Sequence, residues 1–200
     1  MSSIDDKQTI YLNIHFDNAN LTNIEISAKE FENCTFNNCN FTESLFNKCK
    51  FYECQFNQCN LSIIKIKNST FFDTVFHKCK LIGINWTEAS WPRIHLSSPI
   101  KFYQSVLNDS SFFGLSLKEL AIVECSAKEV DFREADCSEA DFSSTDFANS
   151  QFGKTNLTKA DFTEAVNYNI DIFNNRIKQA KFSIPEVVNL LKCLDIQLIE

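Results

Sequence analysis

Apolar residues recur at every fifth position along most of the chain. Between residues 34 and 59 the aromatic rings follow this period without a break: Phe36, Phe41, Phe46, Phe51 and Phe56. We call this position the centre of each five-residue unit. From Phe16 to Leu96 all 17 centres are Phe, Leu, Ile or Trp. A second series of 13 centres runs from Phe102 to Phe162 and is apolar throughout when Ala127 and Cys137 are included.

The position two residues before each centre is small or apolar, and the other three positions of the unit are mostly polar. Cys, Ser, Thr and Ala dominate this second position, and Lys29 is its one charged residue in the first series. Residues two apart lie on the same side of an extended backbone. Each unit therefore directs one large and one small side chain to the interior and three residues to solvent.

A period of five excludes both regular helices and flat strands. Five residues rotate an α-helix by about 500°, so the apolar stripe would drift around the helix. In a flat strand successive centres would alternate between the two faces, because five is an odd number. The pattern instead predicts a bend in every unit, with four units closing a square coil of 20 residues. Coils would then stack as in other β-solenoids, which places Phe36, Phe56 and Phe76 in one interior column.

The unit resembles the pentapeptide repeat, whose pattern is A(D/N)LXX, most clearly in ADFSSTDFANSQFGKTNLTKADF at residues 140–162. This resemblance implies an all-β solenoid, a right-handed quadrilateral β-helix, over residues 12–166. Residues 1–11 would form an N-terminal lead-in, and residues 167–200 a C-terminal capping or dimerisation segment. The chain departs from the family pattern by using Phe where many members have Leu, and Cys where many have Ala.

Eight of the nine cysteines fit this scheme as core residues, and Cys193 lies outside the repeats, where we expect it to be a packing residue as well. Seven occupy the small interior position and Cys137 occupies a centre; the seven are Cys34, Cys39, Cys49, Cys54, Cys59, Cys79 and Cys125. Free cysteine behaves as a small buried hydrophobe. A metal site is the alternative, but neighbouring small positions fall on different edges of the square, and no CxxC pair or histidine cluster accompanies them. We therefore expect reduced, buried thiols and no metal.

The two series of centres are out of register by one residue, near residues 97–101. The offset predicts a bulge or widened corner and not a long loop. Trp86 and Trp91 are centres just before it and are large for a regular interior. Either the coil widens there or one indole turns outward, and the irregularity is either a tolerated defect or a contact for a partner.

The chain changes character after residue 166. Ser183 and Glu186 have capping-box spacing with Pro185 between them, which predicts a short α-helix over residues 184–194. A strand-like segment, residues 196–199, follows. The helix could cap the open end of the solenoid within one chain. The ending also resembles that of the pentapeptide proteins that protect DNA gyrase, which implies a homodimer joined tail to tail. The candidate dimer residues are Val187, Val188, Leu190, Leu191, Leu194, Ile196 and Leu198.

Negative charge is concentrated in the second half of the chain. The net charge of −7 argues against a nucleic-acid-binding protein, which needs a basic surface to neutralise phosphates. Residues 124–165 contain ten acidic and four basic residues, a local net charge of −6. An aspartate next to a centre projects outward and either bonds the turn backbone or faces a partner. The candidate acidic surface consists of Glu129, Asp131, Glu134, Asp136, Glu139, Asp141, Asp146 and Asp161.

Other functional classes find little support in the sequence. Residues 1–10 show no secretory signal, and no stretch approaches 18 consecutive apolar residues, so we expect a cytoplasmic protein without a membrane span. The three histidines are scattered, and neither a nucleophile motif nor a glycine-rich phosphate loop is present. We expect neither an enzyme nor a cofactor.

Two functions remain open. The resemblance to gyrase-protecting members implies a DNA mimic that binds a type II topoisomerase, DNA gyrase or topoisomerase IV, and protects it from quinolone-like drugs or toxins. The alternative is a general protein–protein interaction scaffold without a topoisomerase role.

Overall fold

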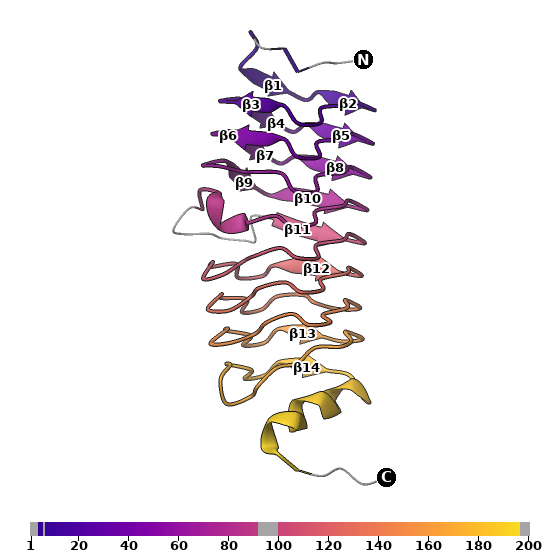
Figure 1. Ribbon diagram of the computed structural model, residues 1–200, viewed down its shortest axis with the longest axis vertical. Helices are drawn as coiled ribbons and strands as arrows, with labels where there is room; N and C mark the ends of the chain where they lie inside the picture. Colours follow the sequence, from indigo (N-terminus) through magenta and orange to yellow (C-terminus); the bar gives the residue numbers. More distant parts are fainter. Residues whose placement is uncertain (1–3, 6, 92–99, 197–200) are drawn as a thin grey trace.

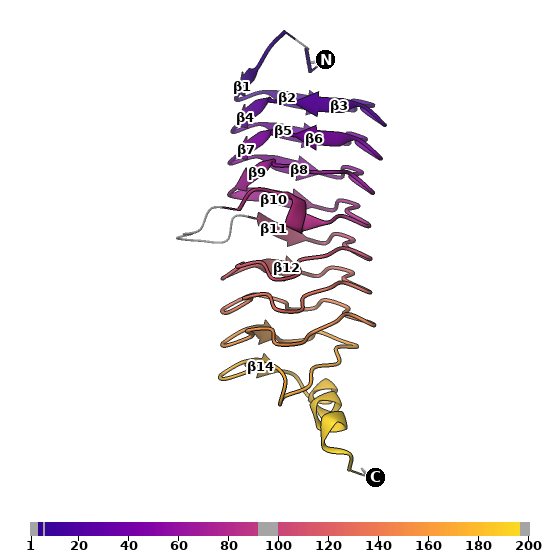
Figure 2. The ribbon, with the colours of Figure 1, turned by 60° about the vertical axis from the view of Figure 1, so that its left-hand side comes forward.

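The chain forms a straight rod of stacked four-sided coils with a short helix at its C-terminal end (Figures 1 and 2). These coils confirm the right-handed quadrilateral β-helix expected from the repeat. The computed structural model describes residues 4, 5, 7–91 and 100–196. Among the described residues no helix is long and apolar enough to cross a membrane.

The strands are short because each side of the square is only one five-residue unit long. In chain order they are β1 (Ile10–Leu12), β2 (His15–Asp17), β3 (Glu25–Ser27), β4 (Glu30–Glu32), β5 (Thr35–Asn37), β6 (Leu45–Asn47), β7 (Lys50–Tyr52), β8 (Gln55–Asn57), β9 (Thr70–Phe72), β10 (Thr74–His77), β11 (Ile100–Tyr103), β12 (Ala121–Val123), β13 (Asp161–Phe162) and β14 (Lys181–Phe182). Two 3₁₀ helices, η1 (Trp86–Glu88) and η2 (Glu186–Leu194), complete the described elements.

All strand pairs are parallel, and most join residues 20 apart in the sequence. One sheet runs along a side of the rod in the order β12-β11-β10-β8-β5-β2, and another follows the order β1-β4-β7-β9. Phe16 pairs with Phe36, Phe36 with Phe56 and Phe56 with Phe76. Bridges outside the named strands continue the same register along the other sides. The spacing of 20 confirms four units per coil.

Most of the corners that the structure describes are formed by a residue with left-handed backbone conformation, two positions after the centre. Asn13, Asn18 and Asn23 have φ values of 55°, 56° and 53°, and this pattern repeats down the chain. Gly83 (φ 70°) and Gly114 (φ 67°) occupy the same corner position, where glycine has no steric penalty. The bend that the period of five requires therefore comes from a left-handed residue in most units. Glutamate and asparagine are the commonest residues at this position, and of the two asparagine is the one that tolerates the conformation well.

The interior is filled by columns of stacked rings. The Phe51 ring lies between those of Phe31 and Phe71, with centroids 5.1 Å from each and interplanar angles of 6° and 8°. Rings on adjacent sides of the square meet edge to face, as Phe51 and Phe56 do at 5.7 Å. Offset stacking and edge-to-face contact are the two favoured aromatic geometries, so both directions of the core are stabilised.

The register shift adds more chain than the sequence pattern predicts. Phe76 pairs with Phe102, so this coil holds 26 residues, six more than the others, where a single extra residue was expected. The predicted centre at Leu96 lies outside the described residues, as do residues 97–99 of the predicted shift. The rings of Phe76 and Phe102 still stack at 5.2 Å, so the column passes this coil without a break.

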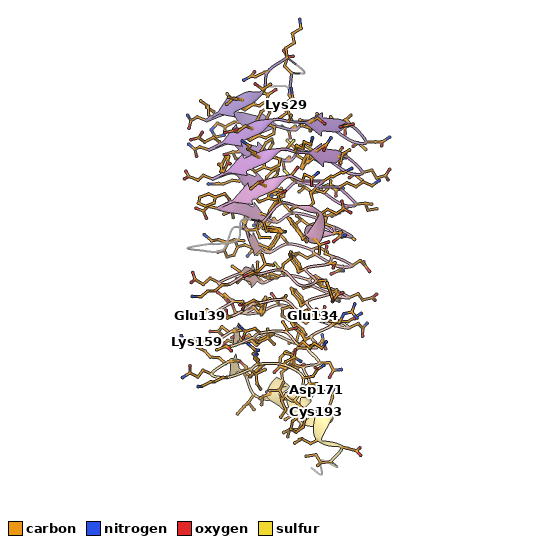
Figure 3. All side chains as sticks on the ribbon, turned by 90° about the vertical axis from the view of Figure 1, so that its left-hand side faces the viewer. Lys29, Glu134, Glu139, Lys159, Asp171 and Cys193 are labelled. Atoms are coloured by element: carbon orange, nitrogen blue, oxygen red, sulfur yellow. The ribbon has the colours of Figure 1, made fainter. Side chains whose placement is uncertain are left out.

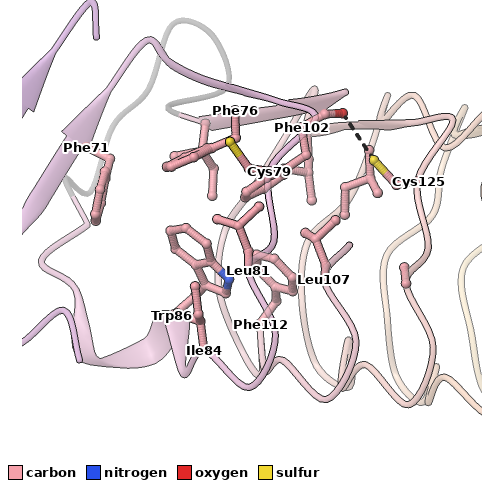
Figure 4. Close-up of a cluster of buried hydrophobic side chains, with 14 of the residues drawn as sticks. Phe71, Phe76, Cys79, Leu81, Ile84, Trp86, Phe102, Leu107, Phe112 and Cys125 are labelled. Atoms are coloured by element: carbon pink, nitrogen blue, oxygen red, sulfur yellow. Dashed lines mark hydrogen bonds between the residues drawn. The ribbon is translucent and has the colours of Figure 1, made fainter. Parts of the chain in front are cut away.

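Both tryptophans before the shift face the interior, and neither indole turns fully outward. Trp86 is completely buried and stacks on Phe112 at 5.7 Å, among the buried side chains of Figure 4. Trp91 is half-buried, stacks on Phe71, and donates its Nε1–H to the carbonyl oxygen of Trp86 at 2.9 Å. The larger rings are accommodated where η1 replaces a regular side of the coil.

The first coil begins earlier than predicted and is closed by the lead-in. Strand β1 starts at Ile10, and Tyr11 is a buried centre that stacks on Phe31 at 5.0 Å. Lys29, the charged residue in a small interior position, is buried and donates from Nζ to the carbonyl oxygens of Asp5 (2.8 Å) and Gln8 (2.7 Å). Its ammonium group therefore holds the lead-in over the open end of the solenoid.

The solenoid also ends later than the boundary of residue 166. Strand β14 pairs with β13, which places Phe182 under Phe162 and adds one further coil. Helix η2 follows, so one short C-terminal helix is confirmed, although it begins at Glu186 and is 3₁₀ rather than α. The predicted capping box is wrong, because the Ser183 hydroxyl accepts the Glu164 N–H and the Glu186 carboxylate accepts the Asn167 N–H. Both side chains bind the coil above instead of capping their own helix.

Candidate partner-binding surfaces

The small interior positions form ladders of hydrogen bonds that connect successive coils. The Cys59 thiol donates to the carbonyl oxygen of Phe36 at 3.3 Å and accepts the N–H of Cys39 at 3.4 Å. Ser105 and Thr145 occupy the same ladder further along and make the same two types of contact. Cysteine is therefore one of three residue types that fill this position while bonding the backbone above it.

The cysteines are mostly buried core residues. All nine are free thiols, and eight of them are buried. Burial raises the pKa of Cys49 to about 11 and that of Cys125 to about 12, so both remain protonated at neutral pH. Figure 4 shows the Cys125 thiol bonded to the carbonyl oxygen of Phe102. Within the described ranges, no group of three or more His, Cys, Asp or Glu side chains is placed to hold a metal ion.

The aspartates of the candidate acidic surface lie on all four sides of the rod. Asp131, Asp136, Asp141 and Asp146 each belong to a different bridge ladder, as the position next to the centre predicts. Asp161 lies directly under Asp141 on the same side. The corner residues Glu129, Glu134 and Glu139 stand between these sides. The structure therefore distributes the eight carboxylates around the rod as a belt rather than gathering them in one patch.

The aspartates also bond the backbone of their own turns. In each case a carboxylate oxygen accepts the N–H of the residue two positions later, at 2.9–3.1 Å; the five are Asp131, Asp136, Asp141, Asp146 and Asp161. Asn40, Asn60 and Asn156 make the same bond in other coils. The expectation that these aspartates bond the turn backbone is therefore correct. This bond uses one carboxylate oxygen and leaves the other available for further contacts.

Lysines and an arginine neutralise five of the eight candidate carboxylates. The pairs are Arg133–Asp131, Lys154–Glu134, Lys118 and Lys159 with Glu139, Lys128–Asp146 and Lys181–Asp161. Figure 3 shows Glu139 and Lys159 one above the other at one edge of the rod. Glu129, Asp136 and Asp141 have no ion pair with any described residue, so no direct contact compensates their charge.

The ion pairs alter the acidity of the aspartates. Partial burial opposes ionisation of Asp131, but the hydrogen bonds and positive charge of Arg133 outweigh it and lower the pKa of the carboxyl group. The pKa values of Asp146 and Asp161 are lowered in the same way, against the effect of burial, with Asn167 and Lys128 acting on Asp146 and Lys181 on Asp161. All three are therefore ionised at neutral pH.

The fold adds two glutamates to the belt that were not among the eight candidate residues. Glu124 and Glu164 stand in one corner column with Ser144 between them, and the Ser144 hydroxyl donates to Glu164 at 3.1 Å. Neither glutamate has an ion pair among the described residues. The 20-residue spacing of the coils was the signal that could have identified them, because it aligns residues 124, 144 and 164.

The candidate dimer residues divide between the core and the surface. Leu190 is buried and Val187 packs beside it against the core, so these two anchor η2 to the solenoid. Val188, Leu194 and Ile196 are 42%, 38% and 52% exposed, and Leu191 is half-buried. Leu198 and residues 197–199 of the predicted strand lie outside the described residues. The helix therefore both caps the last coil and presents apolar side chains to solvent.

The repeat geometry agrees with comparisons to known families. A family model described as "Pentapeptide repeat region" matches residues 29–98, and one described as "Pentapeptide repeats (8 copies)" matches residues 128–165. The chain belongs to the pentapeptide repeat family. A search of curated protein sequences gave no match.

Two of the solved structures that match the chain share its fold. Two trypsin-treated forms of QnrB1, described as a plasmid-mediated fluoroquinolone resistance protein, match with TM-scores of 0.53 and 0.56. Their sequences are 19% and 18% identical to this pentapeptide repeat protein; the matches cover 96% of its chain and 99% and 100% of theirs. HetL from the cyanobacterium Nostoc, involved in heterocyst differentiation regulation, matches with 14% identity, 85% coverage of both chains and a TM-score of 0.42.

Proposed function

We propose that this pentapeptide repeat protein is a DNA mimic that binds a type II topoisomerase, DNA gyrase or topoisomerase IV, and protects it from quinolone-like drugs or toxins. The observation that carries the proposal is the belt of carboxylates around the C-terminal half of a straight rod. The fold it shares with QnrB1, a fluoroquinolone resistance protein, supports the same assignment.

The dimensions of the rod suit this role. Eight coil-to-coil steps separate Phe16 from Phe182 in their column, and at about 4.8 Å per step the solenoid is about 38 Å long. Two copies joined at η2 would give a rod about twice as long, with the acidic belts on either side of the joint. Negative charge would then be highest near the middle of the dimer, where a basic DNA-binding surface could contact both copies.

The chemistry of the interaction is electrostatic and requires no catalysis. Uncompensated carboxylates such as Glu129, Asp136 and Asp141 would take the place of phosphates on a basic surface. Contacts of this kind are screened over about 8–10 Å at physiological ionic strength, so the affinity should fall as salt rises. In this proposal the protein is a non-enzymatic cytoplasmic inhibitor of DNA binding that does not itself contact nucleic acid.

The test is gyrase supercoiling with and without a quinolone, in the presence of the purified protein. A variant with Asp131→Asn, Glu134→Gln, Asp136→Asn and Asp141→Asn should protect less and bind more weakly. Its melting temperature should change little, because asparagine makes the same turn bond as Asn40 and Asn60, and exposed ion pairs contribute little to stability. The matched control neutralises four exposed glutamates of the N-terminal half: Glu25, Glu32, Glu43 and Glu53.

The dimer is tested separately by a chain that ends at Ser183. This truncation should sediment as a monomer and protect gyrase less than the full chain, which should sediment as a dimer. A monomeric full-length protein would remove the dimer from the proposal. Protection by the neutralised variant equal to that of the wild type, independent of salt, would contradict DNA mimicry and favour the general scaffold.

A further inference from the structure

The last two coils separate on one side of the rod and leave a recess against η2. Its volume is about 970 Å³. The wall is formed by residues 148–153 of one coil and residues 167–169 of the next, and η2 contributes Glu186, Asn189 and Lys192. A recess of this size is in the range of sites that bind small ligands or short peptides.

The separation has a local cause in the packing of the last coil. The position five residues after Phe162 is Asn167, but its φ is 58° and its side chain is exposed, while Tyr168 fills the interior instead. The chain therefore reaches the interior one residue late. It rejoins the ladder only where the Lys154 N–H donates to the carbonyl oxygen of Asn174 at 2.7 Å.

Three backbone groups in the wall of the recess lose the partners that their equivalents have elsewhere. In the preceding coil the Glu129 N–H binds the Ala148 carbonyl, and Gln151 joins Val130 and Phe132 through its own N–H and carbonyl, all at 2.9 Å. One coil further on, the corresponding groups are the Asn149 N–H, the Ser150 carbonyl and the Phe152 N–H. None of these three is bonded to any described residue. They form an open strand edge one unit long.

We propose that this edge binds an extended peptide segment of another protein, about four residues long and carrying an acidic side chain. One residue of a parallel strand would donate its N–H to Ser150 and accept the Phe152 N–H, as Gln151 does for the coil above. The carbonyl of the residue three positions earlier would accept the Asn149 N–H. The guest would thus complete the side of the coil that the chain leaves open, by strand addition to an exposed edge.

The side chains around the edge select the chemistry of the guest. Four carboxamides in the lining have no side-chain hydrogen bond to a described residue: Asn149, Gln151, Asn169 and Asn174. Each offers both a donor and an acceptor, as a peptide group does. Of the charged residues, Arg133 is held by Asp131, and Glu186 accepts from Asn167 and Asn189. Lys192 is exposed and has no described ion pair, so it is the group that favours a carboxylate on the guest.

The proposal is tested by screening the full-length protein against an immobilised array of random hexapeptides. Peptides rich in Asp and Glu should be enriched, and Lys192→Glu should weaken their binding about tenfold through loss of one charge-assisted contact. Lys178→Glu is the matched control, because Lys178 is exposed, has no described ion pair and lies outside the recess. No enrichment, or equal effects of the two variants, would overturn the proposal.

Amide hydrogen exchange by NMR distinguishes strand addition from a contact made by side chains alone. On binding an enriched peptide, the Asn149 and Phe152 amides should exchange at least tenfold more slowly, while the Glu129 amide should be unaffected. Unchanged exchange at both sites would refute backbone pairing. Protection that develops without peptide as protein concentration rises would place a second copy in the recess, and would equally overturn the proposal.

Discussion

Replacing one ring of the central column tests the core directly. Phe51 is 1% exposed and lies between two parallel rings. Phe72, at the end of the strand below it, is 47% exposed, and its one aromatic neighbour among the described residues is Tyr52, at a centroid distance of 6.2 Å. Burial and cavity effects together make Phe→Ala cost about 3–5 kcal/mol in a core. Each stacked pair adds about 0.5–1.5 kcal/mol, so Phe51→Ala should lie at the upper end, about 5 kcal/mol.

The assay is thermal unfolding followed by circular dichroism. For a chain of this length 1 kcal/mol corresponds to about 2–4 °C, so Phe51→Ala should lower Tm by about 10–20 °C. Phe72→Ala should lower the free energy of unfolding by less than about 1 kcal/mol, because its ring is largely in solvent already. A Phe51→Ala melt within a degree of the wild type, or equal losses for the two variants, would refute the assignment of centres to the interior.

The remaining predictions concern the thiols and the acidic belt. The eight buried thiols of the native protein should react slowly with a thiol reagent at pH 8 and completely only in denaturant, because the fold shields them from the reagent. Burial also raises the pKa values of Cys49 and Cys125. Rapid native labelling of most thiols, or stoichiometric zinc, would contradict this. Cys59→Ser should retain most of the stability in denaturant titration, since Ser105 makes the same contacts in this ladder. Cys59→Val should cost about 1–3 kcal/mol, because it leaves the buried Cys39 N–H without its acceptor. Equal losses for the two variants would argue against the ladder. Three aspartates have pKa values that are lower in the folded protein than the ordinary value near 3.8: Asp131, Asp146 and Asp161. Their ionised carboxylates therefore stabilise the fold at pH values above 3.8, and this contribution is lost as the pH falls through the lower pKa values of the folded state. Stability measured by denaturation at pH 7 and pH 3 should therefore decline less when all three are changed to Asn, and an unchanged decline would remove them as its cause.

The sequence predicted the repeating part of the molecule because every unit follows the same rule. A period of five with two inward positions determines the square coil, the columns and the burial of residues such as Phe36 and Cys59. Once the coil length is known, a spacing of 20 also predicts which outward residues are neighbours. That step would have paired Lys181 with Asp161 and aligned Glu124 with Glu164.

The ends and the irregular coil could not be predicted in this way. Ser183 and Glu186 have the spacing of a capping box, but tertiary contacts with Glu164 and Asn167 use both side chains instead. At Tyr168 the interior is filled one residue out of register, which no local pattern indicates. The register of centres before Phe102 shifts by the same amount whether a coil gains one residue or six, because the pattern repeats every five residues. The sequence therefore could not distinguish the two lengths.

The enlarged coil between Phe76 and Phe102 shows how this architecture tolerates changes in length. Each coil is supported only by the coils above and below it, so stability is close to a sum over neighbouring layers. Six added residues leave the next strand in register, because the ladder, and not the number of residues, fixes where β11 lies. The entropic cost of a longer loop grows only with the logarithm of its length. A coil of the solenoid can therefore receive new sequence during evolution, or by design, while the coils on either side keep their positions.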